Sequence, residues 1–485
     1  MNYKMMGRLM SLILSIEAAF MLPALIIALC VDGDKAIVAF AVSILITAAA
    51  AVFLWLVSRG AKSIFFARDG FICVALGWIV MSLFGALPFV ISGEIPNFID
   101  ALFEIVSGFT TTGASVVDNP ERLSYSIIYF RSFSHWLGGM GVLVFLLAIM
   151  PLGGSDGFTM HLLRAESPGP DVGKLMPKMR KTAAVLYITY VILTLLDIIF
   201  LSFGDMSLFE AVCTAFGTVG TGGFGIKSDS IAGYSPYVQN VCTVFMFLCG
   251  VNFSCYYLLM LKNVRAVLRD EELRLYCGII FVSIAAITVN LIRNNIFSGV
   301  GETIRHAAFQ VVSIITTTGY STADFDLWPA FSKAILLILM LIGACAGSTG
   351  GGMKCIRLLL IFKIMKRNID QLLNPKRVKK IRVNDKTIDE KILANTNAYL
   401  AAYIIILFVS FLIVSLDGFS IETNISAVFS CFNDIGPGLG GVGPMCNYAG
   451  YSVLSKVVLI FDMLAGRLEI FPVLILFSYR TWARK

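Results

Sequence analysis

The sequence predicts an all-α polytopic membrane protein in which four pseudo-symmetric repeats of span, half-helix and span surround a central pore, preceded by two extra transmembrane helices. Composition is the first reason, because 58% of the 485 residues are hydrophobic and only 14% are charged, which lies outside the range of soluble domains. The second is a series of apolar runs long enough to cross a bilayer. The third is a short motif of threonine and glycine that recurs four times.

The two leading helices are predicted at residues 8–31 and 35–57, within a first unit of residues 1–58. Both runs exceed the roughly 20 apolar residues that a membrane-spanning helix needs. The first run contains Glu17, and no small-residue cleavage site follows it. We therefore interpret it as a retained span rather than as a signal peptide.

Four repeats follow at residues 71–150, 182–261, 275–367 and 394–480. In each repeat an outer span precedes a short half-helix, and an inner span follows the recurring motif. The outer spans are predicted at residues 71–92, 182–203, 275–297 and 394–416, the half-helices at 97–110, 207–218, 302–316 and 421–433, and the inner spans at 125–150, 237–261, 328–365 and 454–479. A Pro/Gly-rich segment at residues 151–171 links the first two repeats.

Basic side chains concentrate in alternate connections between the spans. They are Arg59, Lys62 and Arg68; Arg164, Lys174, Lys178, Arg180 and Lys181; Lys262, Arg265, Arg269 and Arg274; the stretch 354–391; and Arg480, Arg484 and Lys485. The intervening connections carry mostly Asp and Glu. The positive-inside rule therefore predicts that both termini and the basic connections are cytoplasmic. The four motifs would then open outward, into an acidic mouth that attracts cations.

The recurring motif is clearest in SGFTTTGAS (Ser107–Ser115) and SIITTTGYS (Ser313–Ser321), and weaker in FGTVGTGGF (Phe216–Phe224) and FNDIGPGLG (Phe432–Gly440). Four glycines correspond in this alignment, at intervals of about 100 to 120 residues: Gly113, Gly222, Gly319 and Gly438. A half-helix that returns through Thr/Gly backbone leaves carbonyl oxygens free, and the membrane interior tolerates these only around a wet cavity. Four such loops predict a ring.

A ring of carbonyls can replace the water around a dehydrated K⁺ ion, and glycine reaches positive φ without steric cost. The expected ion-binding residues are Thr111, Thr112, Gly113, Gly220, Thr221, Gly222, Thr317, Thr318, Gly319, Gly436, Pro437 and Gly438. The carbonyls expected to coordinate K⁺ are those of Thr111, Thr112, Val219, Gly220, Thr317, Thr318, Ile435 and Gly436. Taken singly, each glycine motif is also typical of close packing between membrane helices.

Two features of the inner spans predict a gate. The third inner span is interrupted by a glycine-rich stretch from Gly343 to Gly352, and glycine in a helix interior costs about 1 kcal/mol relative to alanine. The gate residues expected here are Gly347, Ser348, Thr349, Gly350, Gly351 and Gly352. Arg467 lies within an apolar run of the fourth inner span, where a positive charge forms a barrier to cations. The alternatives are a passive kink and a structural ion pair of Arg467 with Asp462 or Glu469.

No nucleotide site is predicted in this chain. The stretch from Gly436 to Gly441 lacks the preceding strand of a dinucleotide fingerprint, and the stretch ending at Lys354 has Met353 where a phosphate loop needs Lys. An enzyme is not expected either, because no nucleophile, metal-ligand set or acid–base pair has a suitable spacing in the apolar runs. A coupled secondary transporter for an organic substrate is the other alternative, since broken helices also build those.

Together the four loops resemble the Trk/Ktr/HKT superfamily of potassium-uptake proteins. The two leading spans, the Gly-Pro-Gly form of the last loop and the closing GRLEIFP at residues 466–472 resemble the bacterial TrkH branch. This resemblance covers nearly the whole chain. It implies selectivity glycines at Gly113, Gly222, Gly319 and Gly438, an intramembrane gating loop in the third inner span, and a pore-lining arginine at Arg467.

The resemblance also implies a homodimer in the bacterial cytoplasmic membrane, with one pore per subunit. A separate cytosolic nucleotide-binding subunit of the TrkA type is the implied regulatory partner. Membrane lipid is a further expected partner, and nucleic acid is not. The expected function is K⁺ uptake driven by the membrane potential, either as channel-like flux or as symport with protons or Na⁺.

Overall fold

The computed structural model describes residues 3–60, 67–139, 141, 179–376 and 380–482. The linking segment 151–171 and the last residues of the predicted inner span 125–150 lie outside these ranges. In the described part the chain is helical apart from one antiparallel hairpin, β1 (Arg382–Val383) and β2 (Lys386–Thr387). The all-α class predicted from the sequence is confirmed.

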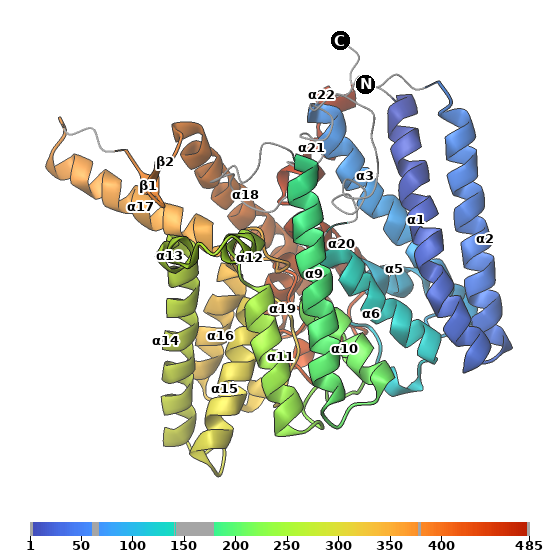
Figure 1. Cartoon of the computed structure of the whole chain (residues 1–485), viewed down its shortest axis with the longest axis horizontal. Coiled ribbons are helices and arrows are strands. Elements are labelled where there is room, and N and C mark those ends of the chain that lie inside the picture. The colour runs from blue at the N-terminus through green and yellow to red at the C-terminus, as the bar shows by residue number, and fades with distance from the viewer. Residues whose placement is uncertain (1–2, 61–66, 140, 142–178, 377–379, 483–485) are drawn as a thin grey trace.

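Two long helices, α1 (Tyr3–Cys30) and α2 (Asp34–Val57), form an antiparallel pair at one edge of the molecule (Figure 1). The other long apolar elements are α3 (Ala67–Gly85) with its continuation α4 (Leu87–Ser92), α9 (Met179–Ser202), α14 (Glu271–Arg293) and α18 (Glu390–Val414). Within the described residues, six helices are long and apolar enough to cross a membrane, or seven if the bent pair α11 (Pro236–Cys249) and α12 (Phe253–Met260) is one span. The chain is a multi-pass membrane protein.

Four shorter helices occupy the positions of the predicted half-helices: α5 (Phe98–Phe109), α10 (Leu208–Gly220), α15 (Val300–Ile315) and α19 (Ile421–Phe432). With 12 to 16 residues each, they are too short to cross a bilayer. Three begin with a side-chain cap. Asn97 and Ser420 accept hydrogen bonds from backbone N–H groups of the first turn, and Ser207 forms a capping box with Glu210.

The inner helices lie between successive short helices and close a ring. They begin with α6 (Tyr125–Gly139), α11, α16 (Ala330–Ile342) and α20 (Val453–Arg467). α6 packs between α5 and α10, and α11 between α10 and α15. In the same way α16 packs between α15 and α19, and α20 between α19 and α5. Because the last short helix is joined to the first through α20, the order of contacts is cyclic.

The sequence predicts one interrupted inner span, whereas three are interrupted within the residues that the structure describes. The second bends by 87° between α11 and α12, where the side chain of Asn252 accepts a hydrogen bond from Ser254 N and starts a new helix. The third is divided into α16 and α17 (Cys355–Leu373). The fourth breaks between α20 and α21 (Phe471–Phe477), where Glu469 and Ile470 have positive φ. The three breaks therefore have different local causes.

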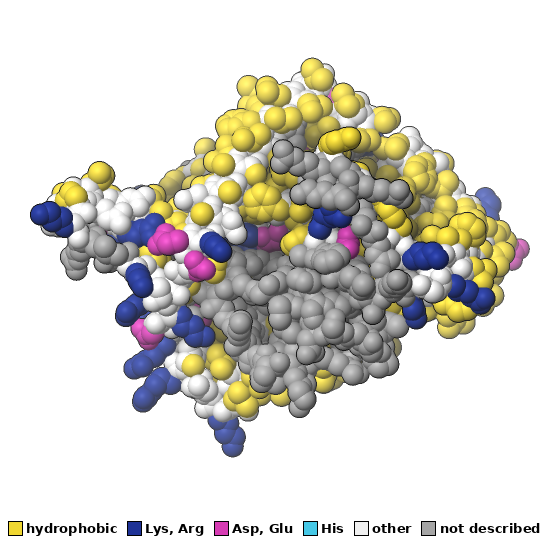
Figure 2. Space-filling view, turned by 90° about the horizontal axis from the view of Figure 1, so that it is seen from above, with side chains coloured by type: hydrophobic (Ala, Val, Ile, Leu, Met, Phe, Trp, Pro, Cys, Tyr) yellow, Lys and Arg dark blue, Asp and Glu magenta, His cyan; other side chains and the backbone are white. Residues whose placement is uncertain are grey.

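The start of α1 and α22 (Tyr479–Trp482) lie at the end of the molecule that carries α17 and the hairpin (Figure 1). The remaining short elements are η1 (Pro120–Arg122), α13 (Val264–Arg269), η2 (Phe325–Leu327), η3 (Ser415–Asp417), η4 (Gly440–Val442) and α22 (Tyr479–Trp482). Figure 2 views this end and shows Lys and Arg side chains gathered on it. Exposed basic residues of the α12–α14 and α17–α18 regions include Lys262, Arg265, Arg269, Arg274, Lys366, Lys376, Lys380, Arg382, Lys386 and Lys391.

Candidate functional site

Each of the four short helices ends in the same turn. Just beyond the helix, one backbone N–H donates to the carbonyl five positions earlier: Thr112 to Ser107 (2.9 Å), Gly222 to Gly217 (2.8 Å), Thr318 to Ser313 (2.8 Å) and Ile435 to Ser430 (3.0 Å). This is the hydrogen bond of a Schellman motif, which requires a left-handed residue just before the donor. The four left-handed residues are Thr111 (φ 60°), Thr221 (55°), Thr317 (57°) and Asp434 (56°).

Threonine at these positions is unusual because the motif normally uses glycine. A β-branched residue at positive φ is a genuine outlier, and a non-glycine residue there costs of order 1–3 kcal/mol. The cost occurs three times in corresponding places, at Thr111, Thr221 and Thr317. Such strain persists only where the surrounding structure enforces it, and it clusters at functional sites.

Two residues after each left-handed residue stands a glycine that is also left-handed: Gly113 (φ 79°), Gly223 (75°), Gly319 (85°) and Gly436 (99°). A Cβ added to Gly113 would overlap the Gly222 carbonyl, and one added to Gly223 would overlap the Thr318 carbonyl. At Gly319 it would overlap the Ile435 carbonyl, and at Gly436 it would lie 2.8 Å from the Thr112 carbonyl. Each glycine therefore lies against the next loop, and the fourth lies against the first.

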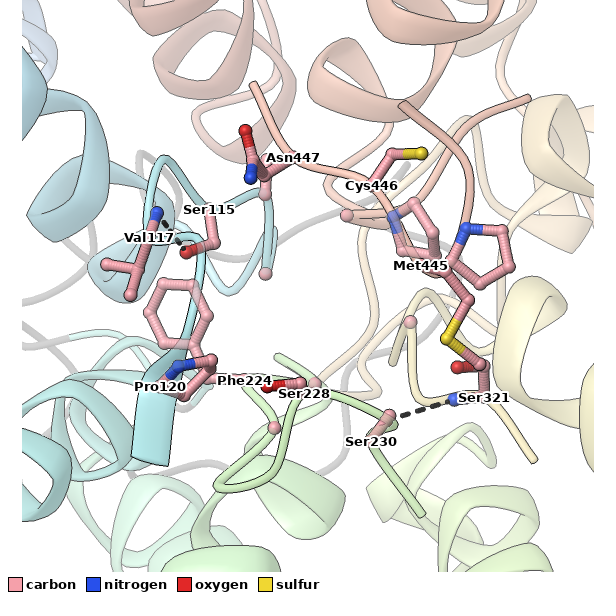
Figure 3. A pocket seen from close by; sticks show the side chains of 18 of the residues that line it. Ser115, Val117, Pro120, Phe224, Ser228, Ser230, Ser321, Met445, Cys446 and Asn447 are labelled. Carbon is pink, nitrogen blue, oxygen red and sulfur yellow. Dashed lines mark hydrogen bonds between the residues drawn. The ribbon is translucent and has the colours of Figure 1, made fainter. Parts of the chain in front are cut away.

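The four glycines line one cavity of about 110 Å³. Figure 3 shows this cavity with side chains from all four loop regions around it, among them Ser115, Phe224, Ser321 and Met445. The loops are therefore brought together around a single space, although they are separated by about 100 residues each in the sequence. Substitution of the glycines would place side-chain atoms on neighbouring carbonyls.

The register of the second loop differs from the sequence alignment by one residue. Gly223 corresponds to Gly113, whereas Gly222 was expected to do so. Because α10 continues to Gly220, the expected carbonyls of Val219 and Gly220 belong to the helix end, and those of Thr221 and Gly222 take the corresponding places. A Cβ on Gly222 would overlap the ring of His135.

The register of the fourth loop differs by two residues. Gly436, not Gly438, corresponds to Gly113, and the corresponding carbonyls are those of Asp434 and Ile435. The Gly436 carbonyl, expected to coordinate K⁺, accepts hydrogen bonds from Ser430 Oγ (2.6 Å) and Tyr448 Oη (2.8 Å). Both of its lone pairs are engaged. Gly438 donates to the Val442 carbonyl (2.7 Å) beyond the ring.

The glycine-rich stretch of the third repeat lies against the left-handed ends of two loops. Gly351 N donates to Thr317 Oγ1 (2.6 Å), and a Cβ on Gly351 would lie 2.6 Å from the Asn433 carbonyl. A Cβ on Gly350 would lie 2.7 Å from the Thr316 carbonyl. Residues 343–354, which we call the glycine segment, therefore pack closely only because they lack side chains at these points.

A buried carboxylate that the sequence analysis did not single out holds the glycine segment at both ends. Glu272 accepts hydrogen bonds from Ala346 N (2.6 Å) and Ile356 N (3.1 Å). The break between α11 and α12 holds the middle of the segment, since Phe253 N donates to the Gly347 carbonyl (2.9 Å). Glu272 stands at the start of a span in the sequence, where an acidic residue is an ordinary helix-start signal.

Arg467 joins the ring to the glycine segment. Its Nη1 donates to the Thr349 carbonyl (2.9 Å) and to Thr111 Oγ1 (3.2 Å). Its Nη2 donates to the carbonyls of Gly138 and Gly139 at the end of α6. The two carboxylates considered as ion-pair partners have other contacts, because Glu469 pairs with Arg357 and Asp462 Oδ1 accepts from Ser410 (2.7 Å).

The acidic residues expected to form the outer mouth mostly accept hydrogen bonds within the protein. Glu94, Asp205 and Asp417 accept hydrogen bonds from the backbone N–H of Ser124, Ser235 and Ser452, just before the inner helices. Hydrogen bonds from Ser235 lower the pKa of Asp205. The charged residues among those that line the cavity are Asp118, Arg131 and Lys227. Arg131 forms a buried ion pair with Glu104 (2.6 Å), so the lining is mixed rather than acidic.

A family model described as a cation transport protein, TrkH, matches residues 36–482. The chain belongs to the TrkH family. It is 36% identical to the Trk system potassium uptake protein TrkH of Escherichia coli K12, over 99% of this chain and 100% of that one. It is also 33% identical to TrkG of the same organism, over 95% of each chain. The crystal structure of the potassium transporter TrkH from Vibrio parahaemolyticus has a TM-score of 0.89, with 30% identity over the full length of both chains.

Membership in the TrkH family confirms the resemblance stated from the four loops. The TrkH family is one of transporters rather than of enzymes. In the described part of this TrkH-family chain, no group of three or more His, Cys, Asp or Glu side chains could hold a metal ion.

Proposed function

We propose that this chain takes up K⁺ across the bacterial cytoplasmic membrane through the ring of four loops. One observation carries the proposal: Gly113, Gly223, Gly319 and Gly436, all left-handed and from four separate repeats, line the same cavity in cyclic order. Relatives named as potassium uptake proteins match the whole chain and support K⁺ as the transported ion.

The selectivity filter in this proposal consists of backbone carbonyls in corrected register. They belong to Thr111, Thr112, Thr221, Gly222, Thr317, Thr318, Asp434 and Ile435. Carbonyls of this kind replace the hydration shell of K⁺, and the ion must bind weakly enough to leave again. The transport energy is electrical, about 2.3 kcal/mol per charge for each 100 mV.

The proposed gate is the glycine segment together with Arg467. Its support is the set of contacts described above, in which Gly351 binds Thr317 and Arg467 binds Thr111 and Thr349. A segment packed against the loops at these points obstructs the exit of an ion. Withdrawal of the segment would break its hydrogen bonds to Thr317, Arg467, Glu272 and Phe253.

Regulation and assembly complete the proposal. We infer a homodimer with one pore per subunit, cytoplasmic termini, and control by a cytosolic nucleotide-binding subunit of the TrkA type. The basic end of the molecule (Figure 2) would face the cytoplasm under the positive-inside rule. The exposed lysines and arginines there could bind the acidic surface of a partner or anionic lipid head groups.

The proposal is tested by K⁺-dependent growth of a cell that lacks its own K⁺ uptake, and by uptake of a rubidium tracer into proteoliposomes. We expect growth rescue, saturable uptake, and competition by K⁺ that is stronger than competition by Na⁺. In Gly113→Ser we expect this preference for K⁺ to fall about ten-fold, because a side chain would displace the Gly222 carbonyl. Equal competition by K⁺ and Na⁺ in the parent chain would contradict the proposal. A dependence of uptake on an imposed proton or Na⁺ gradient would identify symport.

A further inference from the structure

One residue breaks the equivalence of the four loops. At the left-handed position three loops have threonine, Thr111, Thr221 and Thr317, and the fourth has Asp434. The backbone geometry is the same, with φ between 55° and 60° at all four. The difference is therefore one of side-chain chemistry, since a neutral hydroxyl is replaced by a carboxylate.

The Asp434 side chain is fully buried where the fourth loop meets the glycine segment. Its Oδ1 accepts a hydrogen bond from Thr112 Oγ1 (3.1 Å) of the first loop. Its Oδ2 has no hydrogen-bond partner among the residues that the structure describes. A Cβ added to Gly351 would lie 3.0 Å from this oxygen, and one added to Gly466 would lie 3.3 Å from it. The oxygen thus points to the junction of ring, glycine segment and α20.

Two basic residues lie close to this carboxylate. Arg467 follows Gly466 on α20, and Lys354 stands at the end of the glycine segment. Lys354 is 1% exposed and donates to the Gly350 carbonyl. The other basic residue nearby, Arg357, is paired with Glu469. Asp434 is the acidic member of the group that it forms with Arg467 and Lys354.

We infer that Asp434 supplies the counter-charge that lets a cation leave the ring past Arg467 and Lys354. This inference rests on the proposed function. Buried charges of one sign repel a passing cation strongly because the surroundings have a low dielectric constant. A threonine at position 434 would remove this negative charge from the exit. The carboxylate reduces that repulsion, and its uncoordinated Oδ2 offers the ion an oxygen below the carbonyls.

The test is a double-mutant cycle in the full-length chain, with rubidium uptake and the K⁺ concentration for half-maximal uptake as readouts in proteoliposomes. Asp434→Asn keeps the shape of the side chain and removes its charge. Asp434→Thr introduces the residue that the other three loops have at this position. We expect each to lower maximal uptake about ten-fold. In Arg467→Gln we expect higher uptake, and the double variant Asp434→Asn/Arg467→Gln should recover to within about three-fold of Arg467→Gln alone.

A matched control is Asp462→Asn. Asp462 is a second buried carboxylate, and it lies on α20 rather than in a loop. Asp462 binds Ser410 rather than the ring, so we expect uptake to change less than about two-fold. Thermal unfolding in detergent monitors the folding of every variant. Normal uptake by both Asp434 variants would overturn the inference, as would a loss that Arg467→Gln does not relieve. Failure of the parent chain to take up rubidium would instead contradict the proposed function.

Discussion

The four loops share one backbone geometry, whereas the four inner helices differ in where and how they are interrupted. Each loop has the same Schellman turn, a left-handed residue at the same position, and a left-handed glycine two residues later. The inner helices differ from one another: α11 and α12 meet at a sharp bend, α16 and α17 are separated by the glycine segment, and α20 and α21 by two residues at positive φ. Binding a spherical ion requires equivalent oxygens on every side, whereas a gate needs only one element that moves.

The comparison of loops and inner helices also shows where one loop differs from the other three. Asp434 departs from the threonines at its position, and it does so beside Gly351 of the glycine segment. The regular region is therefore altered at its junction with the irregular one. We interpret this junction as the point where binding and gating are coupled.

The largest effect is expected from Gly223→Ala. Its Cβ would overlap the Thr318 carbonyl at a φ of 75°, which L-residues rarely adopt. We expect rubidium uptake to fall by at least about 100-fold. Gly278→Ala in α14 is the matched control, because a Cβ there meets nothing within 4 Å, and it should leave uptake unchanged. Near-normal uptake by Gly223→Ala would show that the corrected register is wrong.

A chain that lacks residues 343–352 tests the irregular region. Removal of most of the glycine segment takes away the contacts with Thr316, Thr317 and Asn433. We expect basal uptake in the absence of any partner to rise about ten-fold, while the preference for K⁺ over Na⁺ is retained. The measurement is rubidium uptake in proteoliposomes with Na⁺ as competitor. Unchanged basal uptake would contradict the role of the segment as a gate.

A smaller rise is expected from Glu272→Gln. Both hydrogen bonds go to the same oxygen of Glu272. The carbonyl oxygen of glutamine can still accept both, but a charged acceptor binds backbone N–H groups more strongly than a neutral one. The bonds to Ala346 and Ile356 would weaken by about 1 kcal/mol in total. Basal uptake should rise about three-fold, and the glycine segment should exchange its amide hydrogens faster. Slower exchange there would argue against Glu272 as the anchor.

The smallest effect is expected from Asp205→Asn, which loosens the start of α11 without touching the ring. Because the folded-state pKa of Asp205 is lowered, its stabilisation is present above the unfolded-state pKa and is lost as the pH falls through the folded-state pKa. The variant should unfold about 1–2 °C lower than the parent at pH 7. The two should converge once the pH has fallen below the folded-state pKa of Asp205. A difference that persisted in acid would exclude this linkage.

The positions of the spans and of the short helices could be predicted because hydrophobic runs and caps are local signals. The register of the loops could not. Two adjacent glycines, Gly222 and Gly223, fit the second motif equally well, and only the hydrogen bond from Gly222 N to the Gly217 carbonyl decides between them. Likewise, the bend after α11 depends on one glycine and one capping residue, Gly250 and Asn252, which occur in many continuous helices.

Contacts between distant parts of the chain were also beyond prediction. Glu272 binds backbone groups that lie more than 70 residues away. The closure of the ring by Gly436 against the first loop joins residues more than 320 positions apart. Such pairs carry no periodic pattern, so three-dimensional packing is needed to identify them.

The most direct measurement is the anomalous scattering of rubidium or thallium ions in crystals of the full-length protein. We predict density for one or more ions on the axis between Gly113, Gly223, Gly319 and Gly436, at coordination distances from the carbonyls of Thr112, Gly222, Thr318 and Ile435. Ions bound only by acidic side chains elsewhere, with an empty axis in a protein that transports rubidium, would contradict the central claim.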